Sequence, residues 1–185
     1  MVLEWPATDI EKFCASNSLF IERAIMVSFS TSALLCAAIL SGIALVSGNM
    51  CQGGCTAGWV HFGDRCFMYT AAKKDWSDAE LNCLSHGGNL ASVHSDDEWR
   101  FIKALVKKND PNENRFWIGM TDSSNEGKWL WSDGSKAVFT KWNRGEPNNA
   151  GLVEDCAEGN YAKSDGWNDV SCKNGFASVC AKPMD

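Results

Sequence analysis

The stretch "AKKDWSDAELNCLSHGGNLASVHSDDEWRFIKALVKKN", residues 72–109, predicts the two helices that decide the fold class. Residues 72–88 place Trp, Ala, Leu and Cys side chains near one face and end in two glycines, which stop a helix well. Residues 95–109 open with Ser95 as N-cap and Glu98 three positions later, a capping-box pattern, with acids in the first turn and lysines in the last. Two helices are therefore expected in close succession.

Strand-like runs follow these helices and are separated by Gly, Asn and Ser residues. They are "FWIGM" (116–120), "WLWS" (129–132) and "ASVCA" (177–181). Helices first and short strands afterwards predict an α+β fold class. The "WIGM" segment is apolar and strand-like, so we interpret its tryptophan and its neighbours as core residues, not as a ligand platform.

Composition limits the size and the partners of the folded part. The chain has 185 residues, of which 45% are hydrophobic, enough for one domain with a core plus an appendage. Its formal net charge of -6 and pI near 5.1 argue against nucleic acid as a partner. Seven of the nine cysteines lie from Cys51 onward, which suits an oxidising compartment. Zinc is not expected, because the CxxxC at Cys51 and Cys55 has no matching second half.

An uncharged apolar segment, "MVSFSTSALLCAAILSGIALVSG", fills residues 26–48. It is long enough to span a bilayer as a signal-anchor, which would make the chain a type II single-pass membrane protein. The acids in residues 1–25 oppose the positive-inside rule, however, and residues 49–54 leave no room for a stalk. We therefore expect a signal peptide and a secreted, extracellular protein, with the anchor as the alternative and Met26 as an alternative start.

The rest of the chain contains a series of motifs in one order: "GWVHFGDRCF", "W…AELNCLSHGGNLASVHSDDEWRFI", "FWIGMTD", "WLWSDGS", "KWNRGEPNN", "EDC", "GWNDVSC" and "SVCA". In this order and spacing they resemble the C-type lectin-like domain, and the resemblance covers residues 55–182. It implies a double-loop α+β fold in which two helices flank small antiparallel sheets and disulfides staple a long loop. The domain then follows an N-terminal segment, residues 1–48, and a short lead, residues 49–54.

The cysteines of the domain allow several pairings, and for six of them sequence alone permits fifteen. The resemblance selects three pairs: Cys55–Cys66, Cys83–Cys180 and Cys156–Cys172. Cys51 is then left over. Two alternatives stay open for it: an intermolecular disulfide that makes a homodimer, or a free or capped thiol in a flexible lead.

The stretch "EPNNAGLVEDC", residues 146–156, gathers oxygen-bearing side chains where no helix or strand runs easily. Proline lacks a backbone donor and fixes its own φ, so the segment is predicted to be a loop. Calcium takes six to eight oxygens from carboxylates, amides and backbone carbonyls, and this loop offers such donors. A solvated acidic loop is the plain alternative, and it weakens once "EDC" and the distal "WND" accompany "EPN".

The resemblance assigns residues to two Ca²⁺ sites. The ligands of the principal site are Glu146, Asn148, Glu154, Asn168 and Asp169, and the same Glu146, Asn148, Glu154 and Asn168 would bind sugar hydroxyls. A cis peptide bond at Glu146–Pro147 would aim the Glu and Asn oxygens at one point. A second, weaker site is implied at Asp122, Glu126, Asn149, Glu154 and Asp155. Asn149 stands where the family often has Asp, which removes one charge from that site.

The function expected from this resemblance is calcium-dependent carbohydrate binding. The order EPN resembles the arrangement that binds mannose-type glycans (mannose, N-acetylglucosamine and fucose), with recognition of microbial glycans in innate defence as the natural role. The alternatives are an ice-binding protein similar to fish type II antifreeze proteins, and a membrane-anchored receptor for protein ligands. No enzyme is expected, because the three histidines show no catalytic spacing and the adjacent Glu154 and Asp155 are better explained as ligands than as a glycosidase pair.

Overall fold

The computed structural model describes residues 54–184, which lie within the second of two compact units, Gly53–Asp185. The predicted signal peptide or anchor at 26–48 and Cys51, for which the resemblance implies no partner, lie outside the described residues. None of the helices that residues 54–184 form has the length and apolar character of a membrane span.

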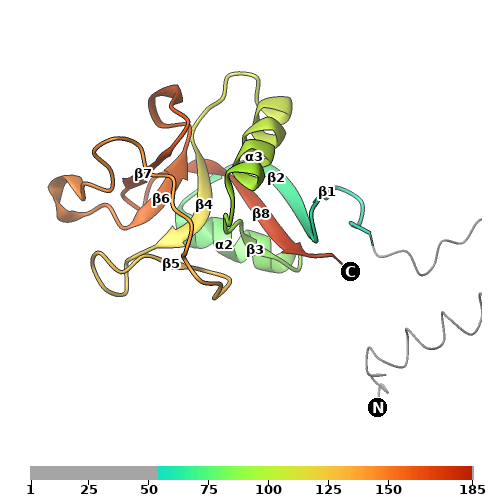
Figure 1. The fold of residues 1–185 in the computed structure, drawn as a ribbon, viewed down its shortest axis with the longest axis horizontal. Helices are drawn as coiled ribbons and strands as arrows, with labels where there is room; N and C mark the ends of the chain where they lie inside the picture. Colours follow the sequence, from blue (N-terminus) through green and yellow to red (C-terminus); the bar gives the residue numbers. More distant parts are fainter. Residues whose placement is uncertain (1–53, 185) are drawn as a thin grey trace, which may run out of the picture. The chain divides into compact units, whose positions relative to one another are not determined.

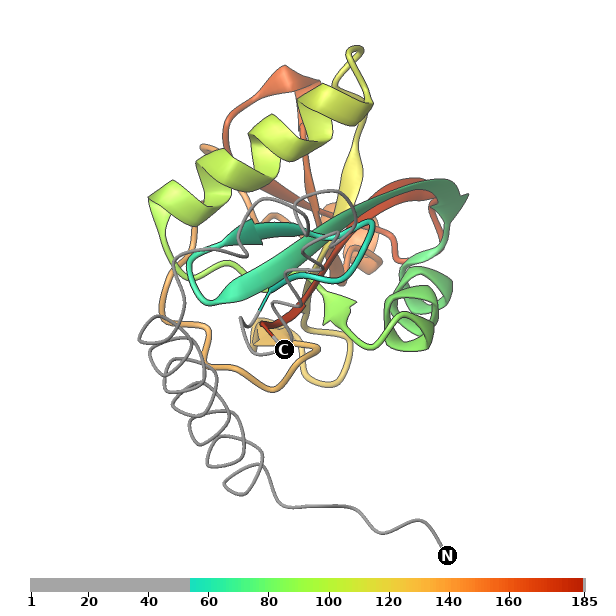
Figure 2. The same cartoon turned by 90° about the vertical axis from the view of Figure 1, so that its right-hand side faces the viewer.

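Eight strands and two α-helices make up this unit (Figure 1). The strands are β1 (Val60–Phe62), β2 (Arg65–Lys74), β3 (Asn89–Leu90), β4 (Phe116–Thr121), β5 (Leu130–Trp131), β6 (Cys156–Gly159), β7 (Trp167–Val170) and β8 (Phe176–Pro183). The helices are α2 (Trp76–Ser85) and α3 (Asp96–Asn109). Figure 2 shows them on opposite sides of the paired strands β2 and β8. The predicted α+β class is confirmed.

The strands join in one sheet in the order β1-β2-β8-β4-β6-β7, while β3 pairs with β8 and β5 with β4. All neighbours are antiparallel except β4 and β8, which run parallel where Phe116 faces Ala177 and Trp117 faces Ser178. The small antiparallel sheets implied by the resemblance are therefore connected. The parallel contact makes the connection, because it joins the β1-β2-β8 end of the sheet to the β4-β6-β7 end.

The helix boundaries follow from capping and from competition with the sheet. α3 begins after Ser95, whose hydroxyl accepts from the Glu98 amide at 3.1 Å, as the capping-box pattern predicts. The Glu98 carboxylate, however, accepts from the His94 amide and not from the N-cap itself. α2 begins four residues later than the predicted 72–88, because β2 extends to Lys74, which pairs with Phe176 of β8.

The larger core cluster is aromatic and lies between α3 and the sheet, and a second cluster packs Trp117 with Ala79 and Cys83 of α2. Trp99 of α3 stacks on Phe116 of β4, with 5.8 Å between ring centroids, and meets Trp167 of β7 edge-on at 5.9 Å. The "WIGM" segment is buried in β4, as predicted. Its Gly119 passes so close to β3 that an added Cβ would lie 2.5 Å from the Leu90 carbonyl oxygen, so only glycine fits there.

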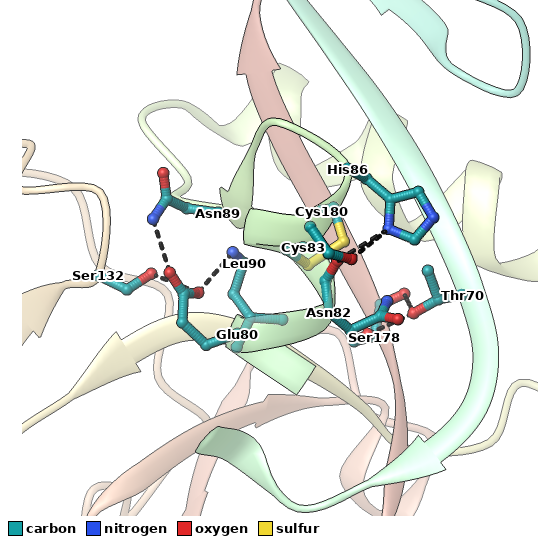
Figure 3. The surroundings of a disulfide bond; sticks show 11 residues. Thr70, Glu80, Asn82, Cys83, His86, Asn89, Leu90, Ser132, Ser178 and Cys180 are labelled. Atoms are coloured by element: carbon teal, nitrogen blue, oxygen red, sulfur yellow. Dashed lines mark hydrogen bonds between the residues drawn. A yellow bond between two sulfur atoms is a disulfide. The ribbon is translucent and has the colours of Figure 1, made fainter. Parts of the chain in front are cut away.

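Three disulfides staple the domain, and they are the pairs that the resemblance implies: Cys55–Cys66, Cys83–Cys180 and Cys156–Cys172. Figure 3 shows Cys83 of α2 bonded to Cys180 of β8. Beside it the Glu80 carboxylate accepts from the Leu90 amide at 2.7 Å and from the Ser132 hydroxyl at 3.0 Å. This carboxylate therefore ties α2 to β3 and to the residue that follows β5.

A long segment, residues 132–155, joins β5 to β6 and contains the short 3-10 helix η1 (Ala150–Leu152). Its first residues, 133–135, line a cavity together with residues 181–183 at the C-terminal end of β8. Cys156, the first residue of β6, bonds to Cys172 just after β7. The disulfide thus holds the end of this segment beside the β7 strand, which contains the "WND" motif.

Candidate functional site

The segment that carries "EPN" is anchored to β7 by its main chain. The Asn143 amide donates to the Trp167 carbonyl at 2.8 Å, and the Trp167 amide donates to the Lys141 carbonyl at 2.7 Å. The Glu146 amide then donates to the Asn143 carbonyl at 3.0 Å, which closes a turn before the proline. The Glu146–Pro147 peptide bond is cis, as expected from the resemblance. These contacts place Asn143 beside Trp167 at the start of β7 and tie Glu146 to Asn143.

Asp169 of β7 clamps the loop from the other side. Its side chain is fully buried, and its carboxylate accepts from the Asn148 amide at 3.0 Å and from the Asn149 amide at 2.7 Å. Charge-assisted bonds of this kind are stronger than bonds between neutral groups. The clamp brings the "EPN" and "WND" motifs together, as the ligand set from the resemblance requires.

The side chains of Glu146 and Asn148 face one another. The Asn148 amide nitrogen donates to Glu146 Oε2, so Asn148 presents its nitrogen toward Glu146. Desolvation raises the pKa of the Glu146 carboxyl above its ordinary value, and the nearby carboxylates of Asp169 and Glu154 raise it further, against a smaller opposing effect of Asn148. Three acidic side chains therefore crowd one another here, which is the electrostatic condition that a bound cation relieves.

Glu154 is held by the turn that precedes it. Its Oε2 accepts from the Ala150 amide at 2.9 Å, and its own amide donates to Asn149 Oδ1 at 3.1 Å. These two bonds tie Glu154 to the start of η1 and hold its carboxylate near Glu146. The Glu154 side chain keeps a second oxygen for another partner.

Asn168, the fifth predicted ligand, is nearly buried in β7. Its amide nitrogen donates to Glu158 Oε1 at 2.9 Å and to the Asp169 carbonyl at 2.6 Å. The structure therefore links all five predicted residues, Glu146, Asn148, Glu154, Asn168 and Asp169, through hydrogen bonds or through direct charge interactions.

The donor set fits a hard cation, since it consists of carboxylate and amide oxygens with neither nitrogen nor sulfur. Within residues 54–184, however, no group of three or more His, Cys, Asp or Glu side chains has the arrangement of a metal cage. Both carboxylate oxygens of Asp169 accept from main-chain amides. Amide oxygens of Asn148 and Asn168 would therefore have to supply part of any coordination shell.

The residues predicted for a second site also lie together. Asp122 is 1% exposed at the end of β4, where its Oδ2 accepts from the Gly127 amide at 2.8 Å. Its Oδ1 finds no hydrogen-bond partner among residues 54–184, an orphaned buried oxygen that fits a cation. Partial desolvation raises the pKa of the Glu126 carboxyl, and the charges of Asp122 and Asp155 raise it further, against an opposing bond to Asn149. An acidic cluster with one unpaired oxygen is thus present.

Sequence reasoning missed one ion pair at this site, between the buried Glu158 of β6 and the partly exposed Arg115 just before β4. The Glu158 side chain is fully buried, and Arg115 Nε donates to its Oε2 at 2.5 Å, while a second nitrogen of the same guanidinium reaches Oε1. Burial raises the pKa of the Glu158 carboxyl, and the bonds from Arg115 and Asn168 oppose that shift. The sequence signal that could have identified Glu158 is an acidic residue within the strand-forming run "CAEG".

Two cavities of the described unit lie away from these residues. One, of about 380 Å³, is lined by residues that include Tyr69, Asp110 and Arg115. Another, of about 550 Å³, includes His94 and Asp133. None of the five predicted ligands lines either cavity.

The family model described as the lectin C-type domain matches residues 72–182. The chain is 49% identical over 167 residues to the lactose-binding lectin l-2 of Anguilla japonica, an alignment that covers 86% of this chain and 99% of that lectin. It is 42% identical over 130 residues to the galactose-specific lectin nattectin of Thalassophryne nattereri, covering 70% of this chain and 81% of nattectin.

Among solved structures, the herring type II antifreeze protein matches with a TM-score of 0.66 and 34% identity over 71% of this chain and 100% of that chain. These relatives are lectins and an antifreeze protein and not enzymes, so we assign no enzymatic activity to this chain. With the fold, the three disulfides and the matched family model in agreement, this chain belongs to the C-type lectin domain family.

Proposed function

We propose that this protein binds glycans in a calcium-dependent manner through Glu146, Asn148, Glu154, Asn168 and Asp169. The observation that carries the proposal is the clamp between the Asp169 carboxylate and the main-chain amides of Asn148 and Asn149. It assembles two motifs from distant parts of the chain into one oxygen-rich cluster. The raised pKa of Glu146 adds support, because crowded carboxylates are relieved when a cation binds.

Calcium, when bound, would supply open coordination positions to a pair of neighbouring sugar hydroxyls. The residues around it do the rest of the recognition. Glu146 can use one carboxylate oxygen as a ligand and accept a hydroxyl hydrogen bond with the other, while the Asn148 amide can donate. The sugar therefore meets an acceptor and a donor in a fixed order. This order is what distinguishes one hydroxyl pair from another.

We propose mannose-type specificity for this order of Glu146 and Asn148. The names of two relatives favour a second candidate, since one is called lactose-binding and the other galactose-specific. The two candidates differ in the orientation of the 4-hydroxyl, which is equatorial in mannose and axial in galactose. A panel of mannose, N-acetylglucosamine, fucose, galactose and lactose decides between them. Preference for the last two sugars would replace the mannose-type proposal while keeping the calcium-dependent lectin.

A second, weaker calcium ion is proposed at Asp122, Glu126, Asn149, Glu154 and Asp155. The orphaned Oδ1 of Asp122 supports this proposal. The Asp122 amide donates to the Asp155 carbonyl at 3.1 Å, so the end of β4 and the "EDC" motif already lie side by side. Asn149 also donates its amide to Asp169, and it would therefore couple the two sites.

The extracellular location is proposed from the disulfides. Three intrachain disulfides need an oxidising compartment to persist. Secretion, cleavage of residues 26–48 and a Cys51-linked homodimer remain predictions. Expression in a eukaryotic cell tests all three: we expect the protein in the medium, a mature N-terminus close to residue 48, and a dimer band that a reducing agent removes. An uncleaved chain in the membrane fraction would favour the anchored receptor.

Affinity chromatography tests the proposed function. The mature protein should be retained on mannose-agarose in millimolar calcium and eluted by EDTA. Passage through both mannose and lactose columns in calcium, with retained folding, would contradict sugar binding. In that case thermal hysteresis of a freezing solution would test the ice-binding alternative, which the likeness to the herring antifreeze protein favours.

A further inference from the structure

Glu158 is a fully buried carboxylate whose position calls for an explanation. It lies in β6, and Arg115 binds it with two nitrogens of the guanidinium fork. Taking the Glu158 carboxylate out of water is costly, and the Arg115 side chain that offsets this cost is itself 34% exposed. Stability alone therefore gives little reason for an ion pair at this place in the core.

The third partner of Glu158 indicates what the pair does. Strands β6 and β7 pair so that Glu158 lies opposite Asn168, one of the proposed calcium ligands. The Asn168 amide nitrogen donates to Glu158 Oε1 at 2.9 Å and to the Asp169 carbonyl at 2.6 Å. An ionised carboxylate and a carbonyl can only accept, so the nitrogen end of the carboxamide must face them. The Oδ1 end must then face the opposite way.

Arg115 holds Glu158 in the orientation that this contact needs. A bidentate fork fixes both carboxylate oxygens, unlike a single ammonium group. The guanidinium is itself supported, since its central carbon lies 4.5 Å from the ring centroid of Phe176 and 5.2 Å from that of Tyr161. The register of β4 and β6, in which Trp117 faces Glu158, places Arg115 close enough to reach. The chain of contacts therefore runs from two aromatic rings through Arg115 and Glu158 to Asn168.

We propose that Glu158 and Arg115 are positioning residues of the cation site: they hold the Asn168 carboxamide so that Oδ1, and not the nitrogen, is offered to the ion. The inference rests on the proposed function, since it concerns one of its ligands. Partners behind a metal ligand commonly matter, and their loss typically costs about 10- to 100-fold in metal affinity. Glu158 and Arg115 touch neither the ion nor the sugar in this proposal.

The central variant is Glu158→Met, which keeps side-chain volume and removes the acceptor. Its calcium Kd, measured by calorimetry, should rise by about 10- to 100-fold. Glu158→Gln is the conservative variant, because its carbonyl oxygen can still accept from Asn168 and from Arg115. It should retain most of the wild-type affinity. Rescue by glutamine separates a hydrogen-bonding role from the loss of a negative charge near the ion.

The matched control is Glu98→Met. Glu98 is also a buried carboxylate bound by an arginine, Arg65 at 2.7 Å, but it caps α3 through the His94 amide and contacts none of the proposed ligands. Its loss should lower the melting temperature while the calcium Kd stays at the wild-type value. A merely structural role for Glu158 would give the same pattern as Glu98.

A measurement without calcium tests the geometry directly. In the calcium-free protein, the side-chain NH₂ signals of Asn168 in an ¹⁵N spectrum should be shifted and slow to exchange, because both acceptors hold them. In Glu158→Met these signals should move toward those of exposed asparagines, and in Glu98→Met they should stay in place. If Glu158→Met does not fold, Arg115→Lys serves instead, since lysine keeps the positive charge and loses the bidentate guanidinium contact. The loss of calcium affinity in Arg115→Lys should be smaller than the loss expected for Glu158→Met.

The outcomes separate this inference from the proposed function. Wild-type protein that binds no calcium overturns the proposed function and the positioning role with it. Wild-type protein that binds calcium, with an unchanged Kd in Glu158→Met and in Arg115→Lys, overturns the positioning role and leaves the function in place. A raised Kd in Glu158→Met, rescue by Glu158→Gln and an unchanged Kd in Glu98→Met establish it.

Discussion

The main-chain amide of Asn148 donates to the carboxylate of Asp169 at 3.0 Å, although 21 residues separate the two positions in the sequence. Asn149 donates to the same carboxylate at 2.7 Å. The clamp is a charge-assisted contact in the buried face of β7, and it fixes where the "EPN" tripeptide lies relative to "WND". Every functional proposal made for this protein depends on that placement.

Asp169→Asn should therefore unfasten the loop. An asparagine side chain turns one of the two acceptor oxygens into a donor, which would face a main-chain N–H group. A buried donor left without a partner costs about 1–3 kcal/mol, so the free energy of unfolding should fall by that amount. Calcium binding should be lost as well. Chemical denaturation in EDTA measures the first effect.

The control for this variant is Asp97→Asn, which breaks an exposed ion pair with Arg100 at 3.2 Å. Exposed pairs contribute little, so its unfolding free energy should stay close to that of the wild type. Equal stability of Asp169→Asn and Asp97→Asn would contradict the clamp.

Calcium should stabilise the folded protein. The sites of extracellular modules bind at about 10⁻⁴–10⁻³ M, so millimolar concentrations are relevant. At about ten times the Kd, mass action adds about 1.4 kcal/mol to the free energy of unfolding, and the melting temperature should rise. Differential scanning fluorimetry with calcium, magnesium and EDTA gives the readout. A melting curve that ignores both calcium and EDTA would count against the cation site.

The pH dependence of the calcium-free protein follows from Glu146. Desolvation, with help from Asp169 and Glu154, raises the pKa of this carboxyl in the folded state above its ordinary value of 4.5. The folded state then holds the proton more tightly than the unfolded chain, so the contribution of Glu146 is fully present below pH 4.5 and is lost as pH rises through the raised pKa. In EDTA, Glu146→Gln should remove this part of the pH dependence.

With calcium present the trend should reverse, because the ion needs deprotonated ligands. The difference in melting temperature between calcium and EDTA should shrink as the solution is acidified toward pH 4.5. Melting curves collected at several pH values check both statements. A calcium effect that grows on acidification would be inconsistent with carboxylate ligands.

The disulfides should differ in their contribution to stability. Cys83 and Cys180 are 97 residues apart, whereas Cys55 and Cys66 are 11 apart. In the loop-entropy model these separations correspond to about 4.7 and about 2.8 kcal/mol. Replacing each pair by alanines should therefore destabilise the domain more for Cys83–Cys180. Equilibrium denaturation of the two double variants measures the difference, and the reverse ranking would show that strain or unfolded-state structure outweighs chain entropy.

Local signals in the sequence predicted those parts of the fold that depend on neighbours in the chain. Ser95 and Glu98 mark the start of α3, because capping is decided within one turn. The start of α2 was predicted too early, because Lys74 pairs with Phe176, about a hundred residues away, and this sheet contact overrides the local pattern. The connected sheet has the same origin, since the parallel contact of Phe116 with Ala177 joins distant segments.

The candidate site was likewise predicted only in part. The resemblance supplied the ligand residues, and the structure places Glu146, Asn148 and Asp169 together. The resemblance could not identify the side chains that hold these ligands in place. Arg115 reaches Glu158 only through the register of β4 against β6, and the unpaired Oδ1 of Asp122 becomes visible only when its surroundings are built. Such contacts depend on tertiary packing that no spacing rule encodes.

The order of donor and acceptor at the sugar site gives a specificity prediction. Exchanging both residues, Glu146→Gln with Asn148→Asp, keeps the ligand oxygens and the net charge but reverses which position donates. Calcium should still bind, while a mannose-type hydroxyl pair meets mismatched groups at about 1–3 kcal/mol for each one left unpaired. Mannose affinity should fall and galactose affinity should rise relative to it. Unchanged mannose binding would mean that other residues read the sugar.

We propose that mannose binds through a calcium ion held by Glu146, Asn148, Glu154, Asn168 and Asp169. Calorimetric titration of mannose into the wild-type protein tests it most directly, once in millimolar calcium and once in EDTA. Binding should be saturable in calcium and absent in EDTA, and it should return when calcium is restored. Mannose binding that persists in EDTA, or no mannose binding by folded, calcium-saturated protein, would rule out this calcium-mediated site.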